Sequence, residues 1–529
     1  PEIAVKPGEQ GPIPAVAAAL RLQKRQWRLP PLELLSASED EGADEAARRE
    51  TEESARRIEE TLEGFGIPAR VVHFERGPAV TRYELETARG VRVSRVVNLA
   101  DDLAMALAAS DVRVEAPIPG RSAIGIEVPN RQVSLVPLRS VMESEEFQGR
   151  RSLLRFALGK DVAGHAIVGD LGAMPHLLVG GATNSGKSVC LNCLIVSLLF
   201  SATPEEVRLI LVDPKRVELS AFEDIPHLLC PVVHDAREAA YVLRRTIKEM
   251  RRRYRLFSPL GVKNIGEYNE ITPARGKEPL AYLVVVVDEL ADLMLQGQVE
   301  FERLICRLAQ LARATGIHLV VATQRPSVNV ITGTIKANIA SRIAFAVASQ
   351  VDSRTILDCN GAERLIGSGD MLYSPLEASR PMRVQGSYIT SREVQAVVNF
   401  LSAQGKPEYA IEPPAEEEEG EQEEEMAEEE EGSLDEYWKA AVDFVRGRKT
   451  VSVSLLQRRL RIGYNRSARL IELMEERGIV GPADGSRPRE VLLDGILDAG
   501  DWEEEPSSSR RAPGAAEESD AEDSPEPVS

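Results

Sequence analysis

The chain has 529 residues, of which 43% are hydrophobic and 28% are charged, and its formal net charge at pH 7 is -20. This length allows about three or four domains of ordinary size, each with its own core. An acidic surface repels nucleic acid in general, so any contact with nucleic acid must come from local basic segments. The most apolar stretch, residues 190–200, is interrupted by Asn192 and Ser197 and is shorter than the roughly 20 apolar residues that a membrane helix needs.

The cysteines favour a reducing compartment. There are five, an odd number in a chain too long to need disulfide bonds for stability. Cys190 and Cys193 form a CxxC pair, but no second pair or suitable histidine lies nearby in the sequence to complete a zinc site. We interpret the pair as small apolar helix residues and expect the sequence as given to be cytoplasmic. The chain begins with Pro1 and shows no secretory signal, so we expect it to be part of a longer protein.

The N-terminal part is predicted to contain a linker and a small domain. Residues 1–49 are expected to be a flexible linker, because "RLPPLELL" is followed by an acidic, polar stretch. Residues 50–140 predict a small α+β domain. Within it we expect a helix in "ARRIEETLEGFGI", strands in "ARVVHFERGPAVTRYELE" and "GVRVSRVV", a second helix in "LADDLAMALAA", and then strands and turns.

A larger unit is predicted over residues 141–411. Five apolar runs, "HLLVG", "RLILVD", "AYLVVVVDE", "HLVVATQ" and "RIAFAV", alternate with helical stretches. Nearly continuous Val, Ile and Leu strands between helices are typical of an α/β fold with a parallel sheet covered on both faces. Beyond this unit, residues 412–432 predict an acidic linker, 433–495 a compact module, and 496–529 a disordered acidic tail.

A phosphate-binding loop is predicted between a strand and a helix. "GATNSGKS" fits the G-x-x-x-x-G-K-[ST] pattern, follows "HLLVG" and opens the helix "SVCLNCLIVSLL". Backbone N–H groups of such a loop and the helix N-terminus bind phosphates, so the expected ligand is ATP. Lys187 would reach the β and γ phosphates, and Ser188 would bind Mg²⁺. The predicted ATP-binding residues are Gly181, Ala182, Thr183, Asn184, Ser185, Gly186, Lys187, Ser188 and Val189.

Two acidic residues end another apolar strand. Asp288 and Glu289 follow "YLVVVV" at the carboxyl edge of the sheet, where ligands bind in such folds. Asp288 would hold the Mg²⁺ ion, directly or through water, and Glu289 would act as general base on the attacking water. The alternative is a pair of solvated acids that cap a helix.

Two further residues are candidates for the catalytic site. Gln324 ends the strand "HLVVATQ" and would contact the γ phosphate or its water; a buried structural amide is the alternative. Arg313 lies just before that strand and would complete the site of a neighbouring subunit, as arginines do in oligomeric ATPases. It equally suits the role of a helix C-terminal cap.

The module 433–495 predicts a winged helix-turn-helix. An apolar helix is followed by "VSVSLLQRRL", a turn at Gly463 and a second helix, and "IVGPADGSRPREVLL" would form the wing. Asn465, Arg469 and Glu472 share one helix face and are suited to base edges in a DNA major groove. Arg458 and Arg466 flank this face and would contact bases or phosphates. A helix stabilised by an Arg469–Glu472 ion pair is the alternative.

Longer segments match one family. They are "PHLLVGGATNSGKSV", "DPKRVELSAFEDIPHL", "VVVVDELADLM", "ARATGIHLVVATQRPSVNVITGTIKANIASRIAF" and "LLQRRLRIGYNRSARLIELMEERGIVGP". These segments resemble the FtsK/SpoIIIE family of DNA translocases over roughly residues 50–495. The resemblance implies a RecA-like P-loop ATPase domain, preceded by the small domain and followed by a winged helix that reads short oriented DNA sequences. It also implies a homohexameric ring around double-stranded DNA.

The resemblance assigns further DNA contacts and partners. Arg325 and Lys336 fall in a pore loop that faces the DNA backbone, and Lys215 and Arg216 lie on or near the other pore loop. Ordinary surface charge is the alternative. Gln350 stands where relatives often carry a basic residue. The family's membrane-spanning region is absent from this sequence, so an anchor in the bacterial inner membrane, and a tyrosine recombinase contact through the winged helix, are implied by resemblance only.

The expected function is an ATP-driven motor that moves chromosomal DNA in a direction set by the C-terminal reader, during cell division or sporulation. Related ATPases of conjugation or secretion systems are the alternative, although secretion ATPases would lack the winged module. A passive DNA-binding regulator is disfavoured by the intact Lys187 and Glu289.

Overall fold

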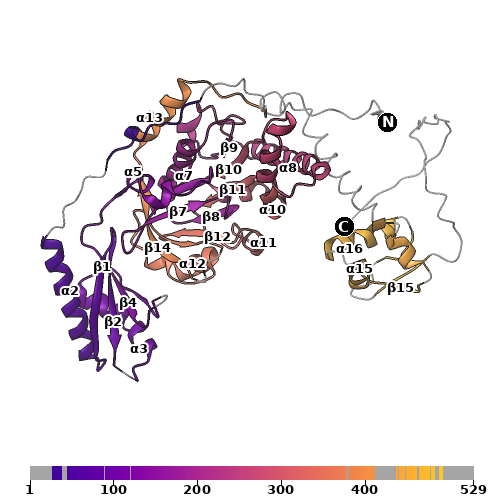
Figure 1. Ribbon diagram of the computed structural model, residues 1–529. Coiled ribbons are helices and arrows are strands. Elements are labelled where there is room, and N and C mark those ends of the chain that lie inside the picture. The colour runs from indigo at the N-terminus through magenta and orange to yellow at the C-terminus, as the bar shows by residue number, and fades with distance from the viewer. Residues whose placement is uncertain are drawn as a thin grey trace, which may run out of the picture. The chain divides into compact units, whose positions relative to one another are not determined.

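The computed structural model describes residues 27–37, 45–88, 90–118, 121–376, 378, 380–411, 437–438, 440–446, 448–460, 464–476, 478–482 and 488–492. The chain separates into two compact units, residues 1–415 and 416–529. Figure 1 shows the elements of each.

A small α+β domain lies near the beginning of the first unit. Its sheet is antiparallel, with the strand order β1-β2-β4-β3. The strands are β1 (Ala69–Arg76), β2 (Val80–Thr87), β3 (Arg113–Glu115) and β4 (Ile124–Pro129), and the helices are α2 (Glu45–Gly64), α3 (Val93–Val97) and α4 (Ala100–Leu107). Ile58 and Leu62 of α2 are buried against Leu85 and Ile126 of the sheet.

One local prediction in this domain is wrong. The stretch 90–97 is expected to be a strand, but Val93–Val97 form the helix α3. The buried positions explain the difference, because Val96, Ala100 and Leu103 face the core at helical spacing.

The motor sheet has ten strands and confirms the α/β prediction. Five strands are parallel in the order β12-β8-β11-β10-β9. They are β8 (His176–Gly180), β9 (Val207–Val212), β10 (Tyr282–Val287), β11 (Ile317–Thr323) and β12 (Ser341–Phe345). Every residue of β8, β9 and β11 is buried, as expected for a sheet covered on both faces.

The rest of this sheet was not foreseen from the sequence. The strands β13, β14, β6 and β7 extend it on the β12 side with antiparallel pairing, so the complete sheet is mixed. They comprise β13 (Asp370–Ser374), β14 (Met382–Tyr388), β6 (Arg155–Asp161) and β7 (Ala166–Asp170), and β5 (Val136–Pro137) pairs with β14.

Helices pack against the strands of this sheet. The longer ones are α7 (Lys187–Ser201), α8 (Ala236–Phe257), α10 (Leu290–Leu311) and α13 (Ser391–Ser402). The shorter ones are α5 (Leu138–Met142), α6 (Glu145–Gln148), α9 (Ile265–Ile271), α11 (Gly333–Asn338) and α12 (Gln350–Leu357). Cys190 and Cys193 are buried core residues of α7. In the described residues, no helix combines the length and apolar character that a membrane crossing requires.

Residues 27–37 are packed on the motor, although they fall within the predicted flexible linker. The turn η1 (Leu32–Leu34) is followed by Leu35, which is 2% exposed and belongs to the motor core. The Ser36 backbone N–H donates to the carboxylate of Glu393 on α13 at 2.7 Å. These contacts join residues more than 350 positions apart, which local composition does not reveal.

A buried charge cluster joins the small domain to the motor sheet. Arg383 of β14 donates to both carboxylate oxygens of Asp370 on β13, at 3.0 and 2.6 Å. It also donates to Glu127 Oε2 on β4 at 2.9 Å. Arg113 of β3 lies 3.2 and 3.1 Å from the two oxygens of the same glutamate. We call these four residues the interdomain cluster.

The second unit has helices and a strand pair that fit the predicted winged helix-turn-helix, whereas the predicted turn at Gly463, the middle of the wing, the acidic linker 412–432 and the acidic tail 496–529 lie outside the described residues. Residues 437–438 and 440–445 are helical and are followed by β15 (Thr450–Val451), α15 (Val453–Leu460) and α16 (Tyr464–Glu476). The strand β16 (Arg489–Glu490) pairs antiparallel with β15 at the base of the wing. Leu470 and Met474 of α16 are buried in the core of this unit.

Candidate active site

The predicted phosphate-binding loop connects β8 to α7. Gly186 precedes the helix with a φ of 114°, a left-handed conformation that favours glycine. A Cβ atom at this position would lie 2.6 Å from Cα of Gly369. The Gly369 N–H donates to the Ser185 carbonyl at 2.9 Å. The loop is therefore packed against a second backbone segment, where a side chain would not fit.

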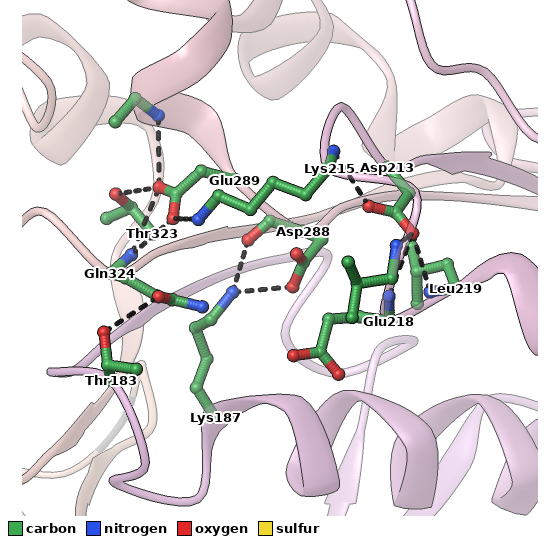
Figure 2. Close-up of polar contacts among 12 residues, drawn as sticks. Thr183, Lys187, Asp213, Lys215, Glu218, Leu219, Asp288, Glu289, Thr323 and Gln324 are labelled. Carbon is green, nitrogen blue, oxygen red and sulfur yellow. Dashed lines mark hydrogen bonds and ion pairs between the residues drawn. The ribbon is translucent and has the colours of Figure 1, made fainter.

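Lys187 and Asp288 are in contact at the carboxyl edge of the sheet. Lys187 is 2% exposed, and its Nζ donates to the Asp288 carbonyl at 2.5 Å and to Asp288 Oδ1 at 2.6 Å. Figure 2 shows these contacts between the start of α7 and the end of β10. Burial raises the pKa of the fully buried Asp288, although the charge of Lys187 acts in the opposite direction.

The same carboxylate fits a magnesium site. Asp288 Oδ2 is buried and accepts no hydrogen bond from the part of the chain that the structure describes. Ser188, the other predicted Mg²⁺ ligand, follows Lys187 in the first turn of α7 and is half-buried. Mg²⁺ takes oxygen ligands and is often bound by one or two carboxylates together with substrate phosphates. The residues present therefore fit this ion.

Glu289 is buried and surrounded by hydrogen-bond donors. Its Oε1 accepts from Thr323 Oγ1 at 2.6 Å, and the Gln324 N–H lies 3.2 and 3.1 Å from its two oxygens. Its Oε2 accepts from Lys215 Nζ at 2.9 Å. Burial alone would raise the pKa of Glu289, but hydrogen bonds from Thr323 and Lys215 and the nearby lysine charges bring it below its usual value.

The helix-capping alternative holds only in part for Glu289. It is the N-cap of α10, and its Oε1 accepts from the Ala291 N–H at 3.4 Å. However, both Glu289 and Asp288 are 0% exposed, so they are not solvated acids. Buried carboxylates with this many polar contacts, at the edge where the phosphate loop lies, are typical of a reactive site.

Gln324 bridges the phosphate loop and the acidic strand end. Its Oε1 accepts from Thr183 Oγ1 at 3.1 Å, while its backbone N–H donates to Glu289. The side chain is half-buried. This position is suited to sensing what binds in the loop. Thr323, which precedes it and contacts Glu289, was not among the sequence candidates.

Lys215 reaches the site from the loop after β9. Asp213 organises this loop: its carboxylate, 0% exposed, accepts from the backbone N–H groups of Lys215, Val217, Glu218 and Leu219 at 2.9–3.2 Å. The side chain of Lys215 is 34% exposed and its ammonium lies against Glu289 (Figure 2). Sequence reasoning missed Asp213, although it follows a buried strand in the same way as Asp288.

The other predicted pore-loop residues lie outside this centre. Arg216, next to Lys215, and Arg325, next to Gln324, are exposed. Lys336 on α11 donates to Asp358 at 2.6 Å, an ion pair that Arg342 shares. Gln350 is exposed at the start of α12. The structure thus brings one of the four predicted pore-loop cations, Lys215, into the nucleotide centre.

Arg313 is exposed at the start of the turn η5 (Arg313–Thr315), which precedes β11. The seven residues of β11 lead from this turn to Thr323 at the other edge of the sheet, a distance of about 20 Å at the usual rise of a strand. Arg313 does not reach the site of its own chain.

The DNA-reading candidates of the second unit lie on α15 and α16. Arg458 is exposed on α15, with its Nε donating to the Ser454 carbonyl at 3.3 Å. Glu472 is exposed on α16. Asn465, Arg466 and Arg469 belong to the same helix, but their side chains lie outside the described residues.

Family models match three regions of the chain. The FtsK alpha domain matches residues 29–130, the FtsK/SpoIIIE family 137–328, and the FtsK gamma domain 432–494. They cover the small domain, the part of the motor sheet from β6 to β11 with its phosphate loop, and the described residues of the second unit.

Curated relatives extend this similarity over most of the chain. A DNA translocase FtsK of Halalkalibacterium halodurans is 51% identical over 92% of the chain and 61% of the relative. The DNA translocase SpoIIIE of Bacillus subtilis is 50% identical over 89% of the chain and 60% of the relative. The chain thus spans about three fifths of the length of these proteins.

Among solved structures, the pCW3 conjugation coupling protein TcpA, in its monomer form with ATPγS, is 24% identical. It covers 64% of this chain and 96% of its own, with a TM-score of 0.45. The three family models and the long alignments at about half identity agree on one classification, and the chain belongs to the FtsK/SpoIIIE family.

Proposed function

We propose that the chain is the motor portion of an ATP-driven double-stranded DNA translocase that moves chromosomal DNA during cell division or sporulation. The observation that carries the proposal is the convergence of Lys187, Asp288 and Glu289 at one buried point beside the phosphate loop. The names of the relatives and the gamma domain in the same chain support DNA as the substrate.

The chemistry follows from the placement of these side chains. Glu289 takes a proton from the attacking water, and the water oxygen forms a bond to the γ phosphorus. The bond between that phosphorus and the bridging oxygen breaks, and its electron pair leaves with ADP. Lys187 stabilises the negative charge on the β and γ phosphates, and Gln324 positions the water. A Mg²⁺ ion bound by Ser188 and Asp288 would neutralise part of the phosphate charge.

The proposal includes a homohexameric ring with DNA in its centre. Arg313 of one subunit would then complete the site of the next, which agrees with its distance from its own site. The exposed Arg216 and Arg325 would hold the DNA backbone by charge alone, because a motor must hold every sequence in turn. Lys336 would join them only after it leaves Asp358.

The second unit would set the direction of movement. Its proposed base contacts are Asn465, Arg469 and Glu472, with Arg458 and Arg466 beside them. The proposal places the motor in the cytoplasm, with any anchor in the inner membrane supplied by a region outside this sequence. A tyrosine recombinase is a further proposed partner of the winged helix.

The motor function is tested by ATP hydrolysis of the full chain with and without double-stranded DNA. We expect DNA to stimulate the wild type, and Lys187→Ala to lower both rates by about 10²- to 10³-fold, as for loss of one transition-state charge contact. The exposed Lys277 provides a control, since Lys277→Ala should change neither rate. Hydrolysis that responds neither to DNA nor to Lys187→Ala would contradict the proposal.

The reader is tested by displacement of a triplex strand from DNA that carries candidate oriented sequences. The variant Asn465→Ala/Arg469→Ala should displace the strand as fast as the wild type but without preference for orientation. A loss of displacement itself would contradict the proposed division of roles between the two units.

A further inference from the structure

Lys215 belongs to two sites at once. Its loop carries the cations expected to face DNA, yet its Nζ lies 2.9 Å from Oε2 of Glu289, the proposed general base. Among the described residues, this carboxylate receives its other hydrogen bonds from Thr323, Gln324 and Ala291, which all belong to the motor sheet edge or to α10. The ammonium of Lys215 is thus the one charged donor to Glu289 in this part of the chain.

The contact occupies the Glu289 oxygen that has fewer other hydrogen-bond donors among the described residues. Thr323 and Ala291 donate to Oε1, Lys215 donates to Oε2, and the Gln324 N–H lies between the two oxygens. A general base must offer a carboxylate oxygen within hydrogen-bond reach of the water that it deprotonates. While Lys215 remains on Oε2, the positive charge of its ammonium lies against that oxygen and makes it a poor acceptor for a proton.

The geometry of the loop makes this contact replaceable. The backbone around Lys215 is fixed by Asp213, so the flexible part is the lysine side chain. That side chain is 34% exposed, whereas Glu289 is fully buried. Water reaches the ammonium and screens the ion pair, so a phosphate group that approaches from solvent competes for it. The adjacent Arg216 is exposed and would draw such a phosphate toward the loop.

We propose that Lys215 couples DNA contact to ATP hydrolysis, because its ammonium restrains Glu289 and a DNA phosphate that binds the ammonium releases the glutamate. This inference rests on the proposed function. It assigns Lys215 a regulatory role beyond a DNA contact, and the two roles alternate. In this way a subunit that holds DNA hydrolyses ATP faster than one that does not.

The test compares ATP hydrolysis of the wild-type chain, Lys215→Met and Lys277→Ala, without DNA and with saturating double-stranded DNA. The methionine keeps the apolar stem and removes the charge. We expect Lys215→Met to raise the DNA-free kcat several-fold, toward the DNA-stimulated rate, and to reduce the stimulation ratio to near one. Lys277→Ala, an exposed lysine without a proposed role, should keep the wild-type rate both without and with DNA.

The conservative variant Lys215→Arg provides a rescue, since it keeps the charge and should restore a low DNA-free rate. A Lys215→Met variant with the wild-type DNA-free rate and weaker DNA affinity alone would overturn the inference. Loss of hydrolysis both with and without DNA would also overturn it, because Lys215 would then support Glu289. A wild type that DNA does not stimulate would instead defeat the proposed function, so the two failures are distinguishable.

Discussion

Two buried charge clusters lie in the first unit, and they differ in how completely their polar atoms are paired. In the interdomain cluster, all four carboxylate oxygens of Glu127 and Asp370 accept hydrogen bonds from arginine. In the nucleotide centre, Asp288 Oδ2 has no partner within the described residues, and Lys215 is partly open to solvent.

This difference separates a structural role from a reactive one. A fully paired buried cluster has no acceptor left for a ligand, so its charges only hold the small domain to the sheet. An incompletely paired cluster retains an oxygen for a cation and a lysine that is able to change partners. Burial of charge alone does not mark a functional site, whereas unused hydrogen-bonding capacity does.

The largest effect is expected from Glu289→Gln in the nucleotide centre, which should lower the ATPase rate but hardly change the stability. Loss of a general base lowers kcat by about 10²- to 10⁴-fold. The amide keeps one oxygen for Thr323, so thermal unfolding should change little. Steady-state ATPase assays and a thermal melt measure both effects. Substantial unfolding together with the lost activity would show that Glu289 is structural.

Glu127→Gln in the interdomain cluster should instead lower the stability strongly and the ATPase activity little. Breaking a buried ion pair by removing one partner costs about 3–5 kcal/mol of stability. Denaturant unfolding of the first unit should show this loss. At a temperature where the variant is folded, its kcat should fall far less than that of Glu289→Gln. The pair of the half-buried Arg139 and the exposed Glu143 offers a control, since Glu143→Gln should cost less than about 1 kcal/mol.

A smaller effect is expected from Thr323→Val, which removes the hydroxyl donor to Glu289 and keeps the side-chain shape. A hydrogen bond to a charged group contributes about 1.5–3 kcal/mol, so we expect kcat to fall by about tenfold or somewhat more. Thr323→Ser retains the hydroxyl and should stay near the wild-type rate. Equal rates for the valine and serine variants would exclude a role for this hydroxyl.

The smallest expected effect is the pH dependence of the stability that Glu127 contributes. Burial alone would raise the pKa of Glu127, but Arg113 and Arg383 bring it below its usual value of 4.5. Its contribution to the free energy of unfolding is therefore fully present above that pH and is lost as the pH falls through the lower folded-state pKa. The stability difference between wild type and Glu127→Gln should shrink between about pH 7 and pH 3. A difference that stays constant over this range would contradict the assignment.

The sequence allowed much of the motor and its centre to be predicted, because these depend on local patterns. The glycine loop, the acidic end of β10 and the five parallel strands each have a signature within a few residues. Asp213 carries a similar signal, an acid directly after a buried strand, and it could have been found by the same reasoning as Asp288.

Other features depend on contacts between distant residues. The interdomain cluster pairs Arg383 with Glu127, 256 positions away, and neither residue is unusual in its own segment. The antiparallel strands β6 and β7 are of mixed polarity, so periodicity does not separate them from loops. The contact of Lys215 with Glu289 also requires the fold, because it joins the ends of two neighbouring strands, 74 positions apart.

The docking of residues 27–37 has a mechanical consequence. Leu35 is held in the motor core, and the Ser36 backbone is bonded to α13. A mechanical force applied to the chain before Trp27 would therefore be transmitted directly to the motor sheet and the helices packed on it. The small domain, which follows in sequence, would lie outside this line of force.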